Sequence, residues 1–446
     1  MTKEKDDKRF KATTPGKRFL KLAGMSASIA KNVASHRVKG LFRDEDSHAQ
    51  SQEQLYSDIG KQIAQTLGEM KGAVMKVGQI ASQVKDMLPD EVASALEVLQ
   101  KESPPMPYPM IRRQLIRALG DTPESLFAHF DETPFAAASI GQVHRALTKE
   151  GEECVVKIQY PGVKESCDSD LKHLKRALKL AGLVKVNAEV IDQTFEEIRR
   201  MLYEELDYVH EAENIKLFRD YYKDHPYIIM PELIESLSSE TVLTLSYVDG
   251  DPLQKVKEPE YSQETINLIG YRIFETFGRQ IYDLRAVHSD PHPGNFAFRP
   301  DGSIVLYDFG AVKLIPQETI DKLRKLVGDA IAGNVETLDK HLLAIGVRQE
   351  GGKTPDREFY NEWLDIFMAP FRDYEAFDFS ESNLHKRVIG KVKRDGLKYI
   401  GSFQPSPETM HVDRVISGHY WTMVDLGVKV SFRPLVDEIV LQQKIA

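Results

Sequence analysis

The stretch "HSDPHPGNFAF", residues 288–298, brings two histidines, an aspartate and an asparagine close together. Its spacing is compatible with two kinds of site. On an extended strand, His288, Asp290 and His292 would point to one side, as the ligands of a transition metal should. Alternatively, Asp290 and Asn295 are five positions apart, which is the separation of the aspartate and the metal-binding asparagine in a phosphoryl-transfer loop. The rest of the sequence has to decide between these two interpretations.

A second motif downstream favours phosphoryl transfer. The segment "VLYDFGAV" (305–312) predicts an apolar strand that ends at Asp308. Phosphoryl transfer needs an aspartate that orients the nucleophile or accepts its proton. It also needs an asparagine oxygen and a second carboxylate that hold Mg²⁺ against the phosphates. We therefore assign the catalytic role to Asp290 and the metal to Asn295 and Asp308. A metallohydrolase would require further ligand motifs such as HExxH, and the sequence has none. The two histidines are interpreted as loop-stabilising residues.

A lysine that contacts phosphates, with a partner carboxylate, should lie upstream of these motifs. The segment "CVVKIQY" (154–160) predicts a strand that carries Lys157, similar to the lysine of the V-A-I-K motif. The segment "YEELDYVHEAEN" (203–214) predicts an acidic helix that supplies candidate partners. Any one of these acids alone would be interpreted as part of a solvated helix face, but together they form a cluster. The candidates are Glu204, Glu205, Asp207, Glu211 and Glu213.

The predicted phosphate-covering loop is "AAASIGQV", residues 136–143. It matches the pattern G-x-G-x-x-G-x-V at Gly141 and Val143, but Ala136 and Ala138 replace the first two glycines. Glycine is used at those positions because it reaches positive φ and lets backbone N–H groups approach the phosphates. Alanine restricts both, so we expect a recognisable loop with altered nucleotide handling.

In this order, the motifs resemble those of the UbiB (aarF-domain) family of atypical kinases. The decisive addition is "MKVGQIAS" (75–82), in which Lys76, Gly78 and Gln79 match the KxGQ signature of that family. Lys76 and Gln79 are three positions apart on a predicted helix and therefore share a face. The alanine-rich loop is typical of the family as well. The resemblance runs from about residue 55 to about residue 320.

The resemblance implies a protein-kinase-like fold and a role for each motif residue. Glu205 and Asp207 fit the ExD motif of the family, and Glu211 fits the glutamate that pairs with Lys157. The helix with KxGQ would lie across the mouth of the active site, where Lys76 would meet Glu205. The residues implied for catalysis are Asp290, Lys157, Lys76 and Glu205. The residues implied for nucleotide binding are Ala136, Ala137, Ala138, Ser139, Gly141, Val143, Lys157 and Glu211.

The implied function is that of an Mg²⁺-dependent, ATP-binding kinase or ATPase that supports ubiquinone or other isoprenoid-lipid metabolism. No A-P-E motif follows "DFG", and the next segment predicts a helix. We therefore expect water or a small lipid-like molecule as acceptor, rather than a protein. Two alternatives stay open. One is a small-molecule phosphotransferase of the aminoglycoside or choline kinase type, and the other is a catalytically silent scaffold that binds nucleotide and lipid.

The expected architecture is an α+β fold with two lobes and an N-terminal helical extension. Residues 1–50 are expected to form a basic arm and residues 51–120 the helical extension with the KxGQ motif. Residues 121–249 are expected to form the N-lobe and residues 250–446 the helical C-lobe. Two cysteines in 446 residues are too few for a disulfide framework, and no signal segment or long apolar run is present, so a cytoplasmic location is expected.

Charge is distributed unevenly along the chain. The net charge is −9, but residues 1–43 contain twelve lysines and arginines against three acids, so the remaining residues sum to −18. An acidic body repels phosphate backbones, which argues against nucleic acid as a partner. Residues 17–42 predict a basic amphipathic helix that lies on an anionic membrane surface. The alternatives are a helix docked on the protein or a disordered tail. The apolar positions of the predicted helix are Phe19, Leu22, Ile29, Val33 and Val38.

Overall fold

The computed structural model describes residues 15–40, 45–70, 105–137, 140–180, 188–396 and 398–443, together with positions 89, 91, 92 and 94. The chain forms two compact units. Unit 1 contains Met1–Glu213 and Glu232–Tyr247, and unit 2 contains Asn214–Pro231 and Val248–Ala446. Within the described ranges, no helix is long and apolar enough to cross a membrane.

Unit 1 contains one antiparallel sheet, in which the strands are ordered β1-β3-β4-β6 and β2 pairs with β3. Its central hairpin joins β3 and β4, whose side chains alternate between buried and partly exposed as in a half-buried sheet. The tight connection contains Gly151 at φ 90°, a backbone conformation that favours glycine. The strands are β1 (Phe127–Phe130), β2 (Ala136–Ala137), β3 (Gly141–Thr148), β4 (Glu153–Gln159) and β6 (Val242–Ser246).

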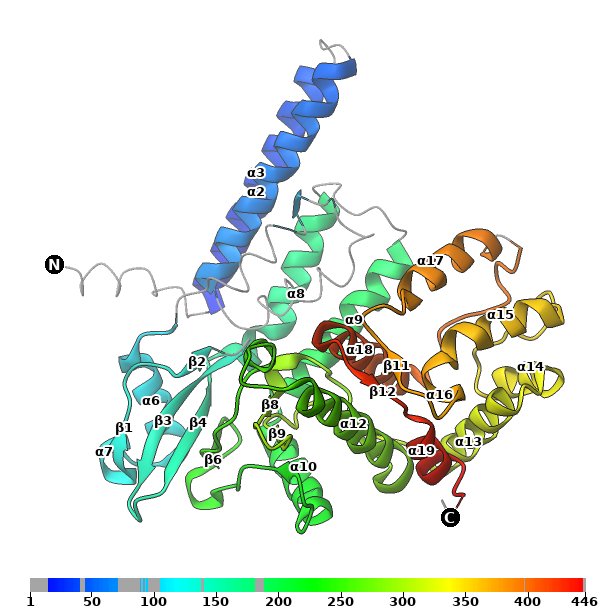
Figure 1. Cartoon of the computed structure of the whole chain (residues 1–446). Coiled ribbons are helices and arrows are strands. Elements are labelled where there is room, and N and C mark those ends of the chain that lie inside the picture. The colour runs from blue at the N-terminus through cyan, green and yellow to red at the C-terminus, as the bar shows by residue number, and fades with distance from the viewer. Residues whose placement is uncertain are drawn as a thin grey trace. The chain divides into compact units, whose positions relative to one another are not determined.

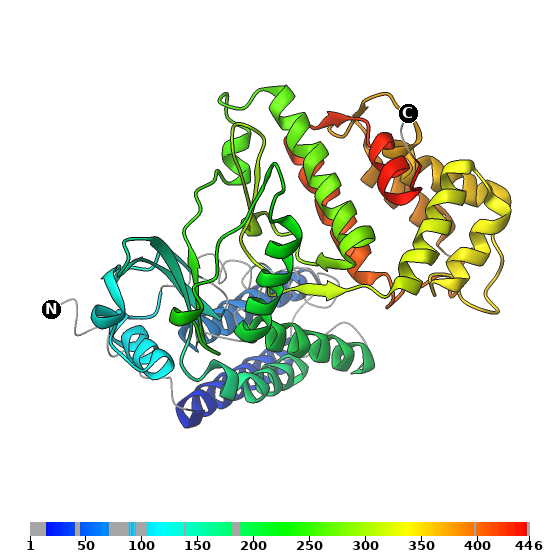
Figure 2. The ribbon, with the colours of Figure 1, turned by 90° about the horizontal axis from the view of Figure 1, so that it is seen from below.

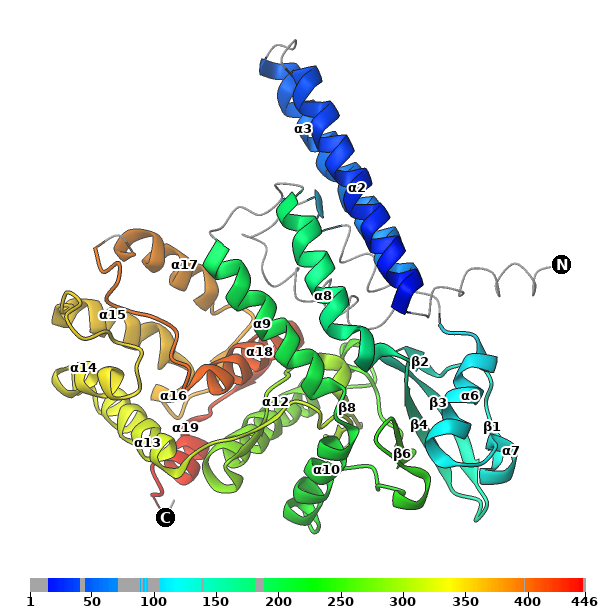
Figure 3. The same ribbon diagram turned by 180° about the vertical axis from the view of Figure 1, so that it is seen from behind.

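Helices complete unit 1. The two N-terminal helices pack side by side as a long hairpin (Figure 1), and α2 also packs against α8. Viewed from behind, α8 and α9 lie next to each other (Figure 3). The helices are α2 (Pro15–Gly40), α3 (Glu45–Met70), α6 (Tyr108–Leu119), α7 (Pro123–Leu126), α8 (Val163–Leu180) and α9 (Ala188–Glu205); α10 (Tyr208–Tyr222) begins in this unit.

The apolar stripe of α2 faces protein. Leu22 and Ile29 are fully buried in the core of unit 1, and Val33 packs against the same cluster. An amphipathic helix buries its apolar face wherever apolar surface is offered, and here α3 and α8 offer it. Of the three interpretations of residues 17–42, the structure therefore favours the helix docked on the protein. Phe19 and Val38 lie outside the side chains that the structure describes.

Unit 2 is mainly helical. Its longest helices are α12 and α18, which pack along each other (Figure 2). Gly270 of α12 permits this close approach, because a Cβ there would lie 3.2 Å from Sδ of Met423 on α18 and 2.5 Å from Val428, which follows α18. The helices are α11 (Leu253–Val256), α12 (Gln263–Arg279), α13 (Gln317–Ala332), α14 (Val335–Ala344), α15 (Arg357–Phe367), α16 (Ala369–Arg372), α17 (Leu384–Asp395), α18 (Met410–Leu426) and α19 (Arg433–Leu435).

Three small sheets connect the helices of unit 2. One pairs β7 with β10, one orders its strands β5-β9-β8, and one pairs β11 with β12. The first two flank residues 288–298. The strands are β5 (Ile228–Ile229), β7 (Ala286–His288), β8 (Phe296–Phe298), β9 (Ile304–Leu306), β10 (Val312–Leu314), β11 (Phe377–Asp378) and β12 (Lys429–Val430). The mixture of a sheet-containing unit and a helical unit is the predicted α+β class.

Candidate functional site

In unit 2, strand pairing brings the predicted catalytic and metal-binding residues together. Asp290 follows β7, and the pairing of β7 with β10 places His288 opposite Val312, shortly after the "DFG" segment. Asn295 immediately precedes β8, and its backbone carbonyl accepts a hydrogen bond from the N–H of Tyr307 at 3.0 Å. Asp308 directly follows Tyr307 in the sequence. Two local pairings therefore fix the positions of three residues that lie within one short stretch of the sequence.

Asn295 is oriented by Asp290. The Nδ2 of Asn295 donates to Oδ2 of Asp290 at 3.1 Å and to the backbone carbonyl of Asp290 at 3.2 Å. Because the amide nitrogen is engaged with Asp290, the amide presents its oxygen on the other side. An asparagine oxygen is a ligand that Mg²⁺ accepts. The hydrogen bond thus orients the amide that is predicted to hold the metal, and it holds the carboxylate of Asp290 in place at the same time.

Asp308 offers a second oxygen ligand. Its side chain is 35% exposed, and Oδ1 accepts a hydrogen bond from the N–H of Gly310 at 3.0 Å. This bond closes a tight turn at "DFG" and fixes the carboxylate through one of its oxygens. One amide oxygen and one carboxylate suit Mg²⁺, which usually takes few protein ligands and completes its shell with phosphate oxygens and water. The residues present therefore fit an Mg²⁺–nucleotide complex.

The rival transition-metal site is not supported by the geometry. His288 is buried and its ring meets those of Phe296 and Phe309, at 5.9 and 6.1 Å between centroids. His292 is exposed, and its Nδ1 accepts a hydrogen bond from the N–H of Gly294 at 3.0 Å. In the part of the chain that the structure describes, no three histidine, cysteine or acidic side chains converge as metal ligands. The ring of His288 is thus packed beside Phe296 and Phe309, and His292 closes a turn within the loop. A loop-stabilising role for both histidines stays a prediction.

In unit 1, Lys157 forms an ion pair with Glu211. Its Nζ lies 2.9 Å from both carboxylate oxygens, so the pair is bidentate. The side chains are only 15% and 2% exposed, and the ammonium also lies 5.0 Å from the ring centroid of Tyr208. Burial makes each member of such a pair dependent on the other, since removing one leaves a charge in a poorly solvated place.

The sheet also aligns the alanine loop with this lysine. Ala136 is paired with Val143, and Val143 is paired with Lys157, so the three residues form one row across β2, β3 and β4. Side chains of directly opposed residues lie on the same face of a sheet. Packing requires glycine at position 141, because a Cβ there would lie 2.4 Å from the backbone oxygen of Ile158.

For three of the other predicted site residues, Ala137, Glu205 and Asp207, the structure gives a position in the fold. Ala137 belongs to β2 and is exposed. Glu205 ends α9 and is partly buried, whereas Asp207 is exposed and accepts a hydrogen bond from the N–H of His210 at the start of α10. The remaining predicted site residues lie outside the described ranges: Lys76, Gly78, Gln79, Ala138 and Ser139.

One residue next to the predicted site was missed by the sequence analysis. Asn214, one turn beyond Glu211 on α10, is 6% exposed, and its Nδ2 donates to the backbone carbonyl of Phe309 at 2.9 Å. This bond holds the residue that follows Asp308. A signal was present, because Asn214 is a polar residue on the buried stripe of a helix that also contains Ile215 and Phe218.

Both cysteines, Cys154 and Cys167, are buried and free. Burial raises the pKa of the Cys154 thiol to about 11, with a smaller contribution from the charge of Glu152. Burial likewise raises the pKa of Cys167 to about 11. The thiolate is the nucleophile, so both groups are unreactive near neutral pH.

A buried histidine beneath the loop gives a testable pH dependence. Burial, and then the charge of nearby His288, lower the pKa of His419 to about 3 from its ordinary 6.5. The unfolded chain therefore binds a proton on this residue below pH 6.5, while the folded chain does not until about pH 3. The resulting contribution to stability is complete above pH 6.5 and is lost as the pH falls toward 3.

Replacing His419 with phenylalanine should remove this contribution and keep a ring stacked on Phe277, which lies 3.8 Å from the imidazole centroid. Between pH 7 and pH 5 the parent should lose about 2 kcal/mol more unfolding free energy than His419→Phe. Urea unfolding at the two pH values measures the difference. Equal pH dependence of the two proteins would contradict a neutral, buried His419.

Comparisons with known proteins agree with the geometry. The family model "ABC1 atypical kinase-like domain" matches residues 98–342, more than half of the chain. The mitochondrial atypical kinase COQ8 of Saccharomyces cerevisiae is 29% identical over 98% of this chain and 87% of its own. The mitochondrial atypical kinase COQ8B of Danio rerio is 30% identical over 84% of this chain, which spans 59% of the length of that relative.

A solved structure shows the same fold. The complex of Rv3197 with erythromycin from Mycobacterium tuberculosis matches with a TM-score of 0.62 and 31% identity, over 84% of this chain and 93% of that chain. The predicted kinase-like fold and the predicted family are therefore confirmed. With its motifs in family order and more than half of its length matched, the chain belongs to the ABC1 family of atypical kinases, the UbiB type.

Proposed function

We propose that this protein is an Mg²⁺-dependent, ATP-binding atypical kinase or ATPase. The observation that supports this most is the bond from Nδ2 of Asn295 to Asp290, which orients one metal ligand and one catalytic carboxylate next to Asp308. Family membership supports the general class of chemistry.

Each residue has a proposed part in the reaction. Asn295 and Asp308 would hold Mg²⁺, which would neutralise negative charge on the phosphates. Lys157, held by Glu211, would contact the phosphates as a fixed positive charge. Asp290 would accept the proton of the attacking hydroxyl or water, since its carboxylate is fixed by Asn295. Lys76 and Glu205 are proposed to form a further catalytic pair, on the family resemblance alone.

We propose water or a small lipid-like molecule as the acceptor. After "DFG" the chain forms β10 and enters α13 at Gln317, which leaves no long segment on which an extended peptide could lie. A solved protein of this fold is a complex with erythromycin, a small organic molecule. The COQ8 names of the relatives support a place in ubiquinone or other isoprenoid-lipid metabolism.

Incubation with radiolabelled ATP tests the acceptor. Generic protein substrates, an isoprenoid-lipid extract and buffer alone would be compared, and free phosphate would be measured beside them. We expect free phosphate or labelled lipid. Strong labelling of added proteins with little free phosphate would make this an ordinary protein kinase. No labelled product and no free phosphate would favour the silent nucleotide-binding scaffold.

The basic arm is proposed to bind an anionic membrane surface through charge. Because Leu22 and Ile29 are buried, attraction by the basic side chains should dominate over insertion, and it should weaken as salt shortens the range of the charges. Sedimentation with anionic liposomes should therefore fall with salt. It should also fall when basic side chains are replaced by glutamine, and neutral vesicles should bind neither protein. The replaced residues are Lys8, Arg9, Lys11, Lys17, Arg18 and Lys31.

These substitutions test the arm without removing α2, whose loss would uncover the apolar faces of α3 and α8. Each basic residue near an anionic surface contributes about 1 kcal/mol of binding free energy, so six replacements should abolish detectable sedimentation at physiological salt. Equal sedimentation of the parent and the variant would refute the arm as the binding element.

A further inference from the structure

Residues 288–298, which contain Asp290 and Asn295, are called the catalytic loop here. Helix α18 touches this loop at Gly418, a position where only glycine fits. A Cβ built on Gly418 would lie 2.1 Å from Cγ and 2.5 Å from Cβ of Pro291. Pro291 directly follows Asp290. Ordinary contact requires about 3.4 Å or more, and neither partner yields easily, because one is the backbone of a helix and the other a proline ring. Any side chain at this position must displace the loop.

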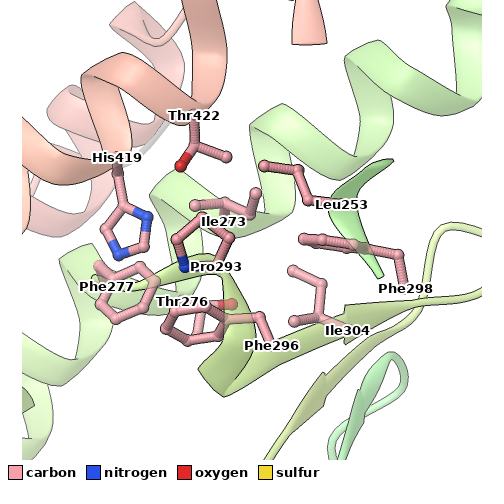
Figure 4. A pocket seen from close by; sticks show the side chains of 10 residues that line it. All are labelled: Leu253, Ile273, Thr276, Phe277, Pro293, Phe296, Phe298, Ile304, His419 and Thr422. Carbon is pink, nitrogen blue, oxygen red and sulfur yellow. The ribbon is translucent and has the colours of Figure 1, made fainter. Parts of the chain in front are cut away.

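The neighbouring residue of α18 packs beneath the same loop. The ring of His419 lies 3.8 Å from that of Phe277 on α12 and 5.6 Å from that of Phe296, which starts β8 after Asn295. Figure 4 shows His419 and Thr422 of α18 facing Phe296 and Pro293 of the loop across a small cavity. The cavity has a volume of only about 10 Å³ and is lined mainly by apolar side chains, so it is too small for a substrate. This region is a packing contact.

We propose that α18 is a positioning element for the catalytic loop, and that Gly418 sets the position of Pro291 and thereby of Asp290. Neither residue touches a reacting atom. The inference rests on the proposed function for Asp290 and extends it to a helix beyond residues 98–342, the range that the family model matches. The loop is thus fixed at two places. The strand that leads into it, β7, pairs with β10, and Pro291 packs against α18, which is distant in sequence.

The central test is Gly418→Ala. One added methyl group should move the loop by about 1 Å, and misplacement of that size costs up to about 10²-fold in rate. We expect kcat for phosphate release to fall between about tenfold and about 10²-fold, with the KM for ATP nearly unchanged. The helix itself should not suffer, since alanine is a better helix former than glycine.

A matched control is Gly390→Ala on α17. It makes the same substitution in a helix, but a Cβ at Gly390 has no atom within 4 Å. This variant should keep the kcat of the parent. A loss of kcat in both variants would attribute the effect to helix rigidity and overturn the proposal.

A smaller residue at position 291 should make room for the methyl group of Gly418→Ala. This distinguishes displacement of the loop from a general loss of structure. Pro291→Gly removes the ring and its Cβ, so adding Gly418→Ala to Pro291→Gly should change kcat less than about twofold. Pro291→Ala keeps the Cβ, 2.5 Å from the built methyl position, so adding Gly418→Ala to this variant should still lower kcat about tenfold or more. The same cost in both backgrounds, or the parent kcat in Gly418→Ala itself, would overturn the inference.

Hydrogen exchange supplies a readout that does not depend on activity. In Gly418→Ala the peptide that spans residues 286–298 should exchange faster than in the parent and in Gly390→Ala, at unchanged exchange in α13. If this holds but the parent releases no phosphate, the proposed function is wrong while the contact still positions the loop. Unchanged exchange of the peptide overturns the positioning inference, whatever the activity.

Discussion

Replacing Asp290 with asparagine is expected to lower phosphate release by about 10²- to 10⁴-fold, the usual contribution of a positioned general base. Asparagine has the shape of aspartate but cannot accept the proton of the attacking water or hydroxyl. The bond from Nδ2 of Asn295 to Asp290 requires an acceptor oxygen, and the amide of an introduced asparagine still provides one. The loop should therefore keep its conformation.

The measurement is kcat for phosphate release, with the KM for ATP determined in parallel. Asp321→Asn on α13 is the matched control, since it makes the same change in charge at an exposed site and should behave like the parent. Near-parental kcat in Asp290→Asn would show that this carboxylate does not act on the nucleophile. A changed KM with unchanged kcat would assign Asp290 to binding.

The second large effect concerns the metal. MgATP at a hundredfold excess over its Kd should raise the unfolding free energy of the parent by ~2.7 kcal/mol. Asp308→Asn should lose most of this gain, because Mg²⁺ loses an anionic oxygen. The asparagine can keep the hydrogen bond from Gly310, which needs only one acceptor oxygen. The variant should therefore unfold like the parent when ligand is absent.

Thermal or urea unfolding with ATP and varied Mg²⁺ measures this effect, and ATP with a chelator separates the metal from the nucleotide. Asp321→Asn should again respond like the parent. The metal assignment fails if Asp308→Asn is stabilised by MgATP as much as the parent is, or if the parent shows no dependence on Mg²⁺.

The chemistry proposed for the site rests on the sequence, because phosphoryl transfer requires particular residue types in a particular order. Asp290, Asn295 and Asp308 were selected by their spacing, and the structure brings them together through short-range pairings of β7, β8, β9 and β10. Such pairings follow from local alternation of apolar residues and turns, which the sequence displays. Lys157 was predictable for the same reason, since a lysine on a strand of apolar residues is a strong local signal.

The partner of Lys157 needed more than the sequence pattern. Five acids lie within a short acidic segment, and helical periodicity alone does not say which of them faces a strand far away in the chain. The family resemblance selected Glu211, and the structure brings this residue within 2.9 Å of Lys157. The deciding contact is that of the first turn of α10 with β4, both of which lie in unit 1.

The sequence by itself determined the fold class, the family and the order of the residues proposed for phosphoryl transfer, because these depend on residue type and local periodicity. Only the tertiary structure shows which element packs on the apolar face of α2 and which residue lies against Gly418. The apolar stripe of α2 looks the same whether it meets a membrane or a protein, and only packing shows that Leu22 and Ile29 face protein. Gly418 likewise carries no local signal, because the proline ring that excludes a side chain there approaches from a remote part of the chain. Contacts between distant segments depend on how whole elements pack, and no short stretch of sequence encodes that.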